Sequence, residues 1–273
     1  MGLITIVAFA VALAAAARST WSPCGLSMLS TITPLSERGR GHRYGGTAAW
    51  FIAGAVLGGV TLGMGAALLA VGWSATGPST AVAEGLAAGA ALLGAAGDAG
   101  LAGIRFPLFR RQVNERWLDQ YRAWFYGAGF GWQVGVGLAT YIMTAGVFVT
   151  IVAATLTGHP WTALGVCVTF GSARGLTVLL TRRLHSTQAL RSFHRHFSWL
   201  EAPVRIGTIA VQIAGGALLA GAVWAPAGAA VVMGSLGVVA VSHQRRQATI
   251  WSRYQSRKAS TEFSITGDSG PGR

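Results

Sequence analysis

The sequence predicts an all-α protein, a polytopic bundle of about seven transmembrane helices, and three observations support this class. Of the 273 residues, 52% are hydrophobic and only 11% are charged, with a mean hydropathy of +0.50. Soluble domains carry about 25% charged residues, so this composition requires an apolar solvent. The apolar residues gather in long runs, and the basic residues gather in alternate connections between those runs.

Seven apolar runs are interpreted as membrane crossings, because a bilayer core of about 30 Å takes roughly 20 apolar residues in a helix. Their approximate bounds are 3–33, 46–72, 82–104, 125–156, 162–180, 206–224 and 227–241. The first run is too long for one straight crossing at about 1.5 Å of rise per residue. We therefore expect a break inside it.

Positive charge alternates between the connections. Of the 21 Lys and Arg residues, 19 lie within 35–45, 105–122, 182–205 and the tail 243–273, and none lies within 73–81, 157–161 or 225–226. Basic loops are retained on the cytoplasmic side of a membrane. The alternation predicts a multi-pass protein of the cell membrane with its N-terminus outside and its C-terminus in the cytoplasm.

The basic connections have expected partners of their own. Residues 105–123 and 183–202 are candidates for interfacial amphipathic helices, and anionic lipid headgroups are the expected partners of such segments. The cytoplasmic basic tail, 243–273, ends in a Ser- and Gly-rich stretch typical of disorder. A net charge of +13 also occurs in nucleic-acid binders. The seven apolar runs exclude that class, so we expect no nucleic-acid partner.

A proline and a cysteine adjoin in the middle of the first run, in Trp21-Ser22-Pro23-Cys24-Gly25-Leu26. Proline removes a backbone donor and breaks a helix, as Pro23 is expected to do here. Non-helical backbone at membrane depth is tolerated where protein or a water-filled cavity surrounds it. Cys24 is therefore a candidate redox thiol presented to a polar cavity. The alternative is a packing kink with an inert buried cysteine.

Three ionisable residues inside apolar runs are candidates for a pathway or a site, since intramembrane charges mark function. Arg18 precedes the Pro-Cys pair and, placed beside the thiol, would favour the reactive thiolate. Asp98 and Arg174 lie at similar depths with opposite charges, so we expect both to face the bundle interior and to pair. The alternative for each arginine, and for Asp98, is an ordinary place at the membrane interface.

The Ser22-Pro23-Cys24-Gly25-Leu26 segment, followed by Pro34, resembles the first helix of the DsbD/CcdA-like thiol–disulfide carriers, the cytochrome c biogenesis proteins. The resemblance implies two inverted three-helix repeats, each opened by a broken Pro-Cys helix. In this chain they correspond to about 1–104 and 124–224. An extra helix at 227–241 completes a transmembrane bundle that spans 1–242.

The second repeat departs from the pattern of that family. Val134 and Gly135 occupy the places of its Pro-Cys pair. A carrier passes two electrons through paired thiols, so the missing cysteine implies impaired dithiol transfer. Cys167 is a weak candidate partner for Cys24, because helix rise places it at a different depth.

Three functions stay open at this point. The first is a thiol–disulfide relay or sensor that uses Cys24, with a thioredoxin-like or other protein partner. The second is a small-solute or ion transporter, with Arg18, Asp98 and Arg174 along the pathway. The third is a non-catalytic membrane scaffold. The sequence holds no nucleotide-binding loop, zinc signature or hydrolase or transferase motif, so we expect no cofactor, no metal site and no classical enzyme activity.

Overall fold

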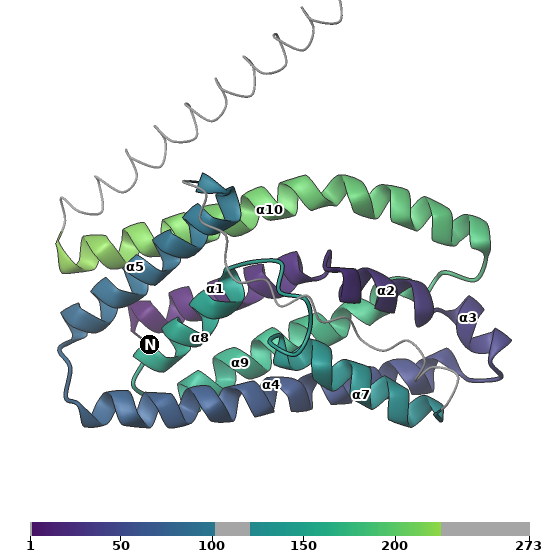
Figure 1. The fold of residues 1–273 in the computed structure, drawn as a ribbon, viewed down its shortest axis with the longest axis horizontal. Coiled ribbons are helices and arrows are strands. Elements are labelled where there is room, and N and C mark those ends of the chain that lie inside the picture. The colour runs from purple at the N-terminus through teal and green to yellow at the C-terminus, as the bar shows by residue number, and fades with distance from the viewer. Residues whose placement is uncertain (1, 102–120, 225–273) are drawn as a thin grey trace, which may run out of the picture.

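The computed structural model describes residues 2–101 and 121–224, and every regular element within them is helical (Figure 1). The helices are α1 (Leu3–Ser19), α2 (Pro23–Thr31), α3 (Pro34–Gly39), α4 (Tyr44–Ala75), α5 (Thr80–Ala99), α7 (Ala123–Val136), α8 (Gly146–Leu156), α9 (Pro160–Leu176) and α10 (Thr187–Val223), with a 3₁₀ helix (Thr177–Thr181) after α9. The predicted all-α bundle is confirmed.

Four helical spans are long and apolar enough to cross a membrane: α4, α5, Pro160–Thr181 and α10. The bent pair α1 and α2 is a fifth candidate span. Large apolar side chains cover the outside of the bundle, where Leu68 is 74% and Trp161 is 82% exposed. Such a surface is stable when it faces lipid, so the fold is that of a membrane protein.

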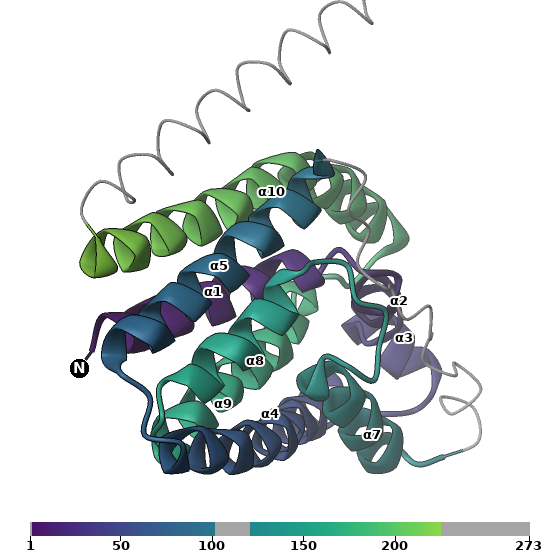
Figure 2. The same ribbon diagram turned by 60° about the vertical axis from the view of Figure 1, so that its left-hand side comes forward.

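Two long helices form opposite sides of the bundle. In Figure 1 and in the turned view of Figure 2, α4 and α10 lie apart, and α1, α8 and α9 fill the space between them. Helix α4 packs against α7 and α9, while α5 packs against α10. The apolar clusters at these contacts are rich in alanine, which lets the helix axes approach closely.

Glycines bring α4 and α7 into backbone contact. A Cβ atom at Gly54 would lie 2.1 Å from the Ala128 carbonyl oxygen, and one at Gly131 would lie 2.0 Å from that of Phe51. Neither position therefore accepts a larger residue without separating the two helices. This contact fixes the position of α7, and with it the position of the candidate site.

The connections segregate by charge. The α3–α4 and α9–α10 connections lie at one end of the bundle, and the α4–α5 and α8–α9 connections lie at the other (Figure 1). A hydrogen bond of 3.3 Å from the Leu35 amide of α3 to the Leu184 carbonyl joins α3 to the α9–α10 connection. The α3–α4 and α9–α10 connections carry arginines, and the other two carry no Lys or Arg.

Two predicted segments differ from the structure. The run 125–156 is two helices, because Gly137 adopts a φ of +73° and ends α7 while α8 begins nine residues later at Gly146. Conversely, the predicted interfacial helix 183–202 and the run 206–224 are largely one helix, α10. Pro203 lies inside that helix without ending it. Lipid-facing and core contacts on both sides of Pro203 outweigh the one hydrogen bond that a proline removes.

Several predictions lie outside the described residues. These are most of the interfacial helix predicted at 105–123, the seventh run at 227–241 and the basic tail at 243–273.

Candidate functional site

The first broken segment is built by its local sequence. Helix α1 ends at Ser19, α2 begins at Pro23, and the two axes differ by 65°. Pro23 occupies the first turn of α2, where its missing N–H costs nothing. The Ser22 side chain caps the new helix by accepting a 3.2 Å hydrogen bond from the Gly25 amide.

Gly25 allows the tight bend at this break. A Cβ atom there would lie 2.3 Å from the Thr20 carbonyl oxygen, so only glycine fits against the end of α1. Trp21 fixes the outside of the bend: its indole N–H donates to the Phe197 carbonyl at 2.9 Å, and its ring stacks on the Phe197 ring at 4.3 Å. The close approach of Gly25 to Thr20 and the contacts of Trp21 with Phe197 thus fix the break between α1 and α2.

Cys24 lies in the first turn of α2 and is 4% exposed. It interacts electrostatically with Arg174 of α9, which is 2% exposed. The helix N-terminus carries a partial positive charge, and Arg174 adds a full one. One partial and one full positive charge therefore act on the Cys24 sulfur.

Arg174 also joins this site to the second broken segment. Its Nη1 atom donates to the Val134 carbonyl oxygen at 2.6 Å, while its buried Nη2 atom has no hydrogen-bond partner among the described residues. Val134 and Gly135 lie in the last turn of α7, just before the break at Gly137. Arg174 thus interacts both with Cys24 of the first segment and with Val134 of the second.

Cys167 is separate from this site. It is fully buried in an apolar cluster on α9, seven residues and so about 10 Å before Arg174 along the helix. No disulfide joins it to Cys24. Two turns of α9 therefore separate Cys167 from the arginine that interacts with Cys24.

Arg18 has a carboxylate partner in the structure. It is 7% exposed in the last turn of α1 and forms an ion pair of 3.4 Å with Glu201 of α10. Its Nη1 atom is buried and has no partner in the described part of the chain. Arg174, 150 residues from Cys24 in the sequence, also interacts electrostatically with this cysteine, and the expected effect of Arg18 on the thiol stays a prediction.

The predicted pair of Asp98 and Arg174 is wrong. The Asp98 carboxylate accepts hydrogen bonds from the Ala145 amide at 2.8 Å, the Thr144 hydroxyl at 2.5 Å and the Gln212 amide at 2.9 Å. Similar depth in two helices does not bring them together, because α5 packs against α8 and α10 rather than against α9. Asp98 instead lies at the N-terminus of α8, whose partial positive charge stabilises the carboxylate.

Two polar residues of the interior were not predicted. Glu37 of α3 is completely buried and accepts hydrogen bonds from Arg40, Thr47 and Tyr126. Gln212 of α10 is completely buried beside Asp98, and its Oε1 atom has no partner among the described residues. A lone glutamine in the apolar run 206–224 was the available signal for the second.

Across residues 2–101 and 121–224, no group of three or more His, Cys, Asp and Glu side chains is placed to hold a metal ion.

The fold and the site define a helical membrane protein in which a buried arginine of α9 interacts with a cysteine after the bend between α1 and α2, and with the last turn of α7. No protein-family model matches the chain, and no solved structure matches it. It is similar to the methylamine utilization protein MauF of Paracoccus denitrificans, with 30% identity over 177 residues, which are 62% of this chain and 61% of that protein. The chain thus spans less than two thirds of that relative.

Two further relatives carry the same description. The methylamine utilization protein MauF of Methylophilus methylotrophus is 28% identical over 223 residues, 80% of this chain and 75% of that protein. The one of Methylorubrum extorquens is 28% identical over 164 residues, 58% and 56% of the two chains.

Proposed function

We propose that this protein is a membrane-embedded thiol–disulfide exchange protein in which Cys24 is the working thiol. We further propose that it serves a step of amine metabolism, as the description of its MauF relatives suggests. The observation that carries the thiol chemistry is the position of Cys24 in the first turn of α2, beside the buried Arg174. The resemblance of the Pro23-Cys24 segment to the DsbD/CcdA-like carriers supports the same class.

The single thiol determines the chemistry. The Cys24 thiolate attacks one sulfur of a partner's disulfide, an S–S bond forms to Cys24, and the other partner sulfur leaves as a thiolate that takes a proton. A thiolate of a donor dithiol, such as that of a thioredoxin-like protein, then attacks the Cys24 sulfur and releases the reduced partner. The donor's second thiolate closes the donor disulfide and restores Cys24. Two electrons pass from donor to partner, and no second cysteine of this chain is needed.

Arg174 has a positioning role in this proposal. A buried arginine with an unpartnered Nη2 atom costs free energy, on the order of 1–3 kcal/mol for an unsatisfied group. That cost is offset when negative charge develops on the neighbouring sulfur. The bond to Val134 holds the guanidinium in place, so the second broken segment contributes an anchor where the carrier family has a cysteine.

Thiol trapping in native membranes tests the proposal. A Cys167→Ala variant, grown and then acid-quenched, is treated with a mass-tagged maleimide before and after reduction. We expect a fraction of Cys24 to be protected by a reducible mixed disulfide, and no such species in the Cys24→Ala control. If Cys24 is fully reduced under every growth condition and Cys24→Ala membranes keep full function, the proposal fails.

A second measurement tests Arg174. The rate of Cys24 alkylation by a small maleimide is compared between Arg174→Gln and Arg18→Gln, since both remove one buried arginine charge. We expect Arg174→Gln to slow alkylation about tenfold, because the reacting sulfur loses the positive charge that interacts with it. Equal rates in the two variants would assign the effect to general loss of charge.

A transporter is the second candidate, favoured by the polar cluster around Asp98. This cluster joins α5, α8 and α10, and includes the unpartnered Oε1 atom of Gln212. A carboxylate and an amide oxygen would suit a small cation such as methylammonium. Uptake of labelled methylammonium into vesicles, which Asp98→Leu should abolish, tests this function. Uptake equal to that of vesicles without the protein rules it out.

A further inference from the structure

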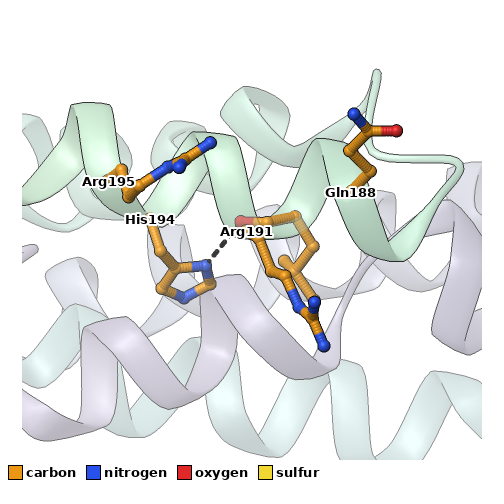
Figure 3. Close-up of a pocket in the computed structure, with 5 residues that line it drawn as sticks. Gln188, Arg191, His194 and Arg195 are labelled. Carbon is orange, nitrogen blue, oxygen red and sulfur yellow. Dashed lines mark hydrogen bonds between the residues drawn. The ribbon is translucent and has the colours of Figure 1, made fainter.

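A pocket of about 670 Å³ lies against the first turns of α10, and none of its residues belongs to the Cys24 site (Figure 3). The described residues that line it are Gln188, Leu190, Arg191, His194 and Arg195. Their spacing of three and four residues places them next to one another on the helix surface. In Figure 3 the Arg191 and His194 side chains project from the same side of α10.

The two arginines of this pocket lack a balancing carboxylate in the described structure. Arg191 and Arg195 are one turn apart, a spacing at which like charges repel. The ion pairs that residues 2–101 and 121–224 form are Arg18–Glu201 and Arg40–Glu37. An anion bound between Arg191 and Arg195 would offset their repulsion.

His194 is held in place on the pocket wall by two hydrogen bonds. Its Nδ1 atom lies 2.9 Å from the Leu190 carbonyl oxygen, and its Nε2 atom lies 3.0 Å from the Ser30 hydroxyl. The second contact ties this side of α10 to α2. Arg191 and Arg195, by contrast, make no ion pair with a described carboxylate, so their N–H groups are available for a ligand.

The same side of α10 continues into an apolar surface. Trp199, one turn beyond Arg195, is 83% exposed, and Leu200 is 52% exposed. Tryptophan is enriched at the level of the lipid headgroups, and basic residues next to it attract anionic lipid. The sequence Arg191, Arg195, Trp199, with a spacing of four residues, therefore places the pocket where a headgroup meets the bundle.

We propose that this pocket binds the phosphate group of an anionic phospholipid, through the guanidinium groups of Arg191 and Arg195. Arginine binds phosphate with paired, charge-assisted hydrogen bonds, and two arginines without a carboxylate partner among the described residues suit a phosphate whose charge no headgroup cation balances. The lipid is favoured over free phosphate because Trp199 and Leu200 offer its acyl chains an apolar neighbour. This inference does not depend on the thiol chemistry of Cys24.

Native mass spectrometry of the full chain in detergent tests the site. The protein is titrated in separate arms with short-chain phosphatidylglycerol, with short-chain phosphatidylcholine and with inorganic phosphate. The variant Arg191→Gln/Arg195→Gln is compared with Arg182→Gln/Arg183→Gln, which removes the same charge from exposed residues just before α10 and outside the pocket. All four side chains are exposed, so neither variant should disturb the fold.

We expect phosphatidylglycerol to bind more tightly than phosphatidylcholine, and the pocket variant to weaken it about 25-fold, as two basic contacts of about 1 kcal/mol each imply. The control variant should change binding by less than threefold. Equal weakening in both variants would show diffuse charge attraction and overturn the proposal. Inorganic phosphate that binds as tightly as the lipid and displaces it would overturn the assignment to a lipid.

Discussion

At the scale of single residues, the interior of this bundle is polar where helices begin and end. Glu37 lies in the short helix α3, directly after the first broken segment, and its carboxylate is completely shielded from solvent. Tyr126 of α7 donates to it at 2.7 Å, and Arg40 donates at 3.1 Å. One buried carboxylate thus links the start of α4 to the start of α7, and it holds the end of the bundle that carries the arginines.

Removing one donor to Glu37 should therefore be costly. Tyr126→Phe keeps the buried ring and deletes only the hydroxyl, leaving the carboxylate short of a hydrogen bond. We expect a loss of about 1.5–3 kcal/mol in the free energy of unfolding, the usual range for a hydrogen bond to a charged group. Denaturant titration in detergent micelles measures it. Tyr141→Phe is the matched control, because Tyr141 makes no side-chain hydrogen bond to a described residue, and an equal loss there would contradict the prediction.

At the scale of elements, glycine decides which helices meet. Gly131 of α7 faces the Phe51 carbonyl oxygen of α4 and has no room for a Cβ atom. A Cβ atom added at Gly65 of α4 would have no neighbouring atom within 4 Å. Gly131→Ala should therefore push α7 away from α4, costing about 1–3 kcal/mol by overpacking. Gly65→Ala should be neutral or stabilise the helix by about 0.5–1 kcal/mol. Thermal unfolding of both variants gives the comparison, and equal midpoints would mean that α7 is not held by this contact.

Much of this level was predictable from the sequence, and the exceptions have physical causes. Pro23 marks the first break because it has no N–H and begins α2. The second break was not placed, because Gly137 looks like any other glycine of its run until its φ of +73° is seen. Pro203, by contrast, lies inside α10 without ending it. Local residue types set where a helix weakens, and packing decides whether it ends there.

The candidate site shows the same limit. Cys24 and Arg174 are 150 residues apart, and hydropathy gives each a depth but no direction around its helix. Depth alone suggested Asp98 as the partner of Arg174. In the packed structure, the Asp98 carboxylate instead accepts hydrogen bonds from Thr144 and Gln212. The residue types that matter were therefore identifiable, but their pairing required the arrangement of α5, α8, α9 and α10.

At the scale of the whole molecule, the described helices follow a similar order in the two predicted repeats. Each half opens with a broken segment, α1–α2 or α7–α8, and continues with two helices, α4 and α5 or α9 and α10. Helix α4 packs against α9 and α5 packs against α10, so equivalent helices of the two halves are neighbours. Inverted repeats related by an axis in the membrane plane produce such contacts. The predicted repeats stay a prediction, and this packing supports them.

An inverted arrangement has a consequence for topology that can be measured. The α3–α4 and α9–α10 connections, which hold arginines, should face the cytoplasm, and the α4–α5 and α8–α9 connections should face outward. Alkaline phosphatase, which is active only outside the cytoplasm, is fused in turn after Gly41, Gly77, Gly158 and Arg183. We expect activity after Gly77 and Gly158 only, with green fluorescent protein giving the opposite pattern.

The fusions after Gly77 and Gly158 also decide whether α7 and α8 together cross the membrane. Since α5 is one crossing between these two points, the same location for both requires a second crossing by α7 and α8, even though neither helix is long enough alone. If the two points lie on opposite sides, α7 and α8 form a re-entrant loop and the two halves are not inverted copies. Activity after Gly41 and Arg183 instead of Gly77 and Gly158 would keep the repeats but reverse the protein. Cys24 would then work from the opposite face, and its dithiol donor would have to come from the other compartment.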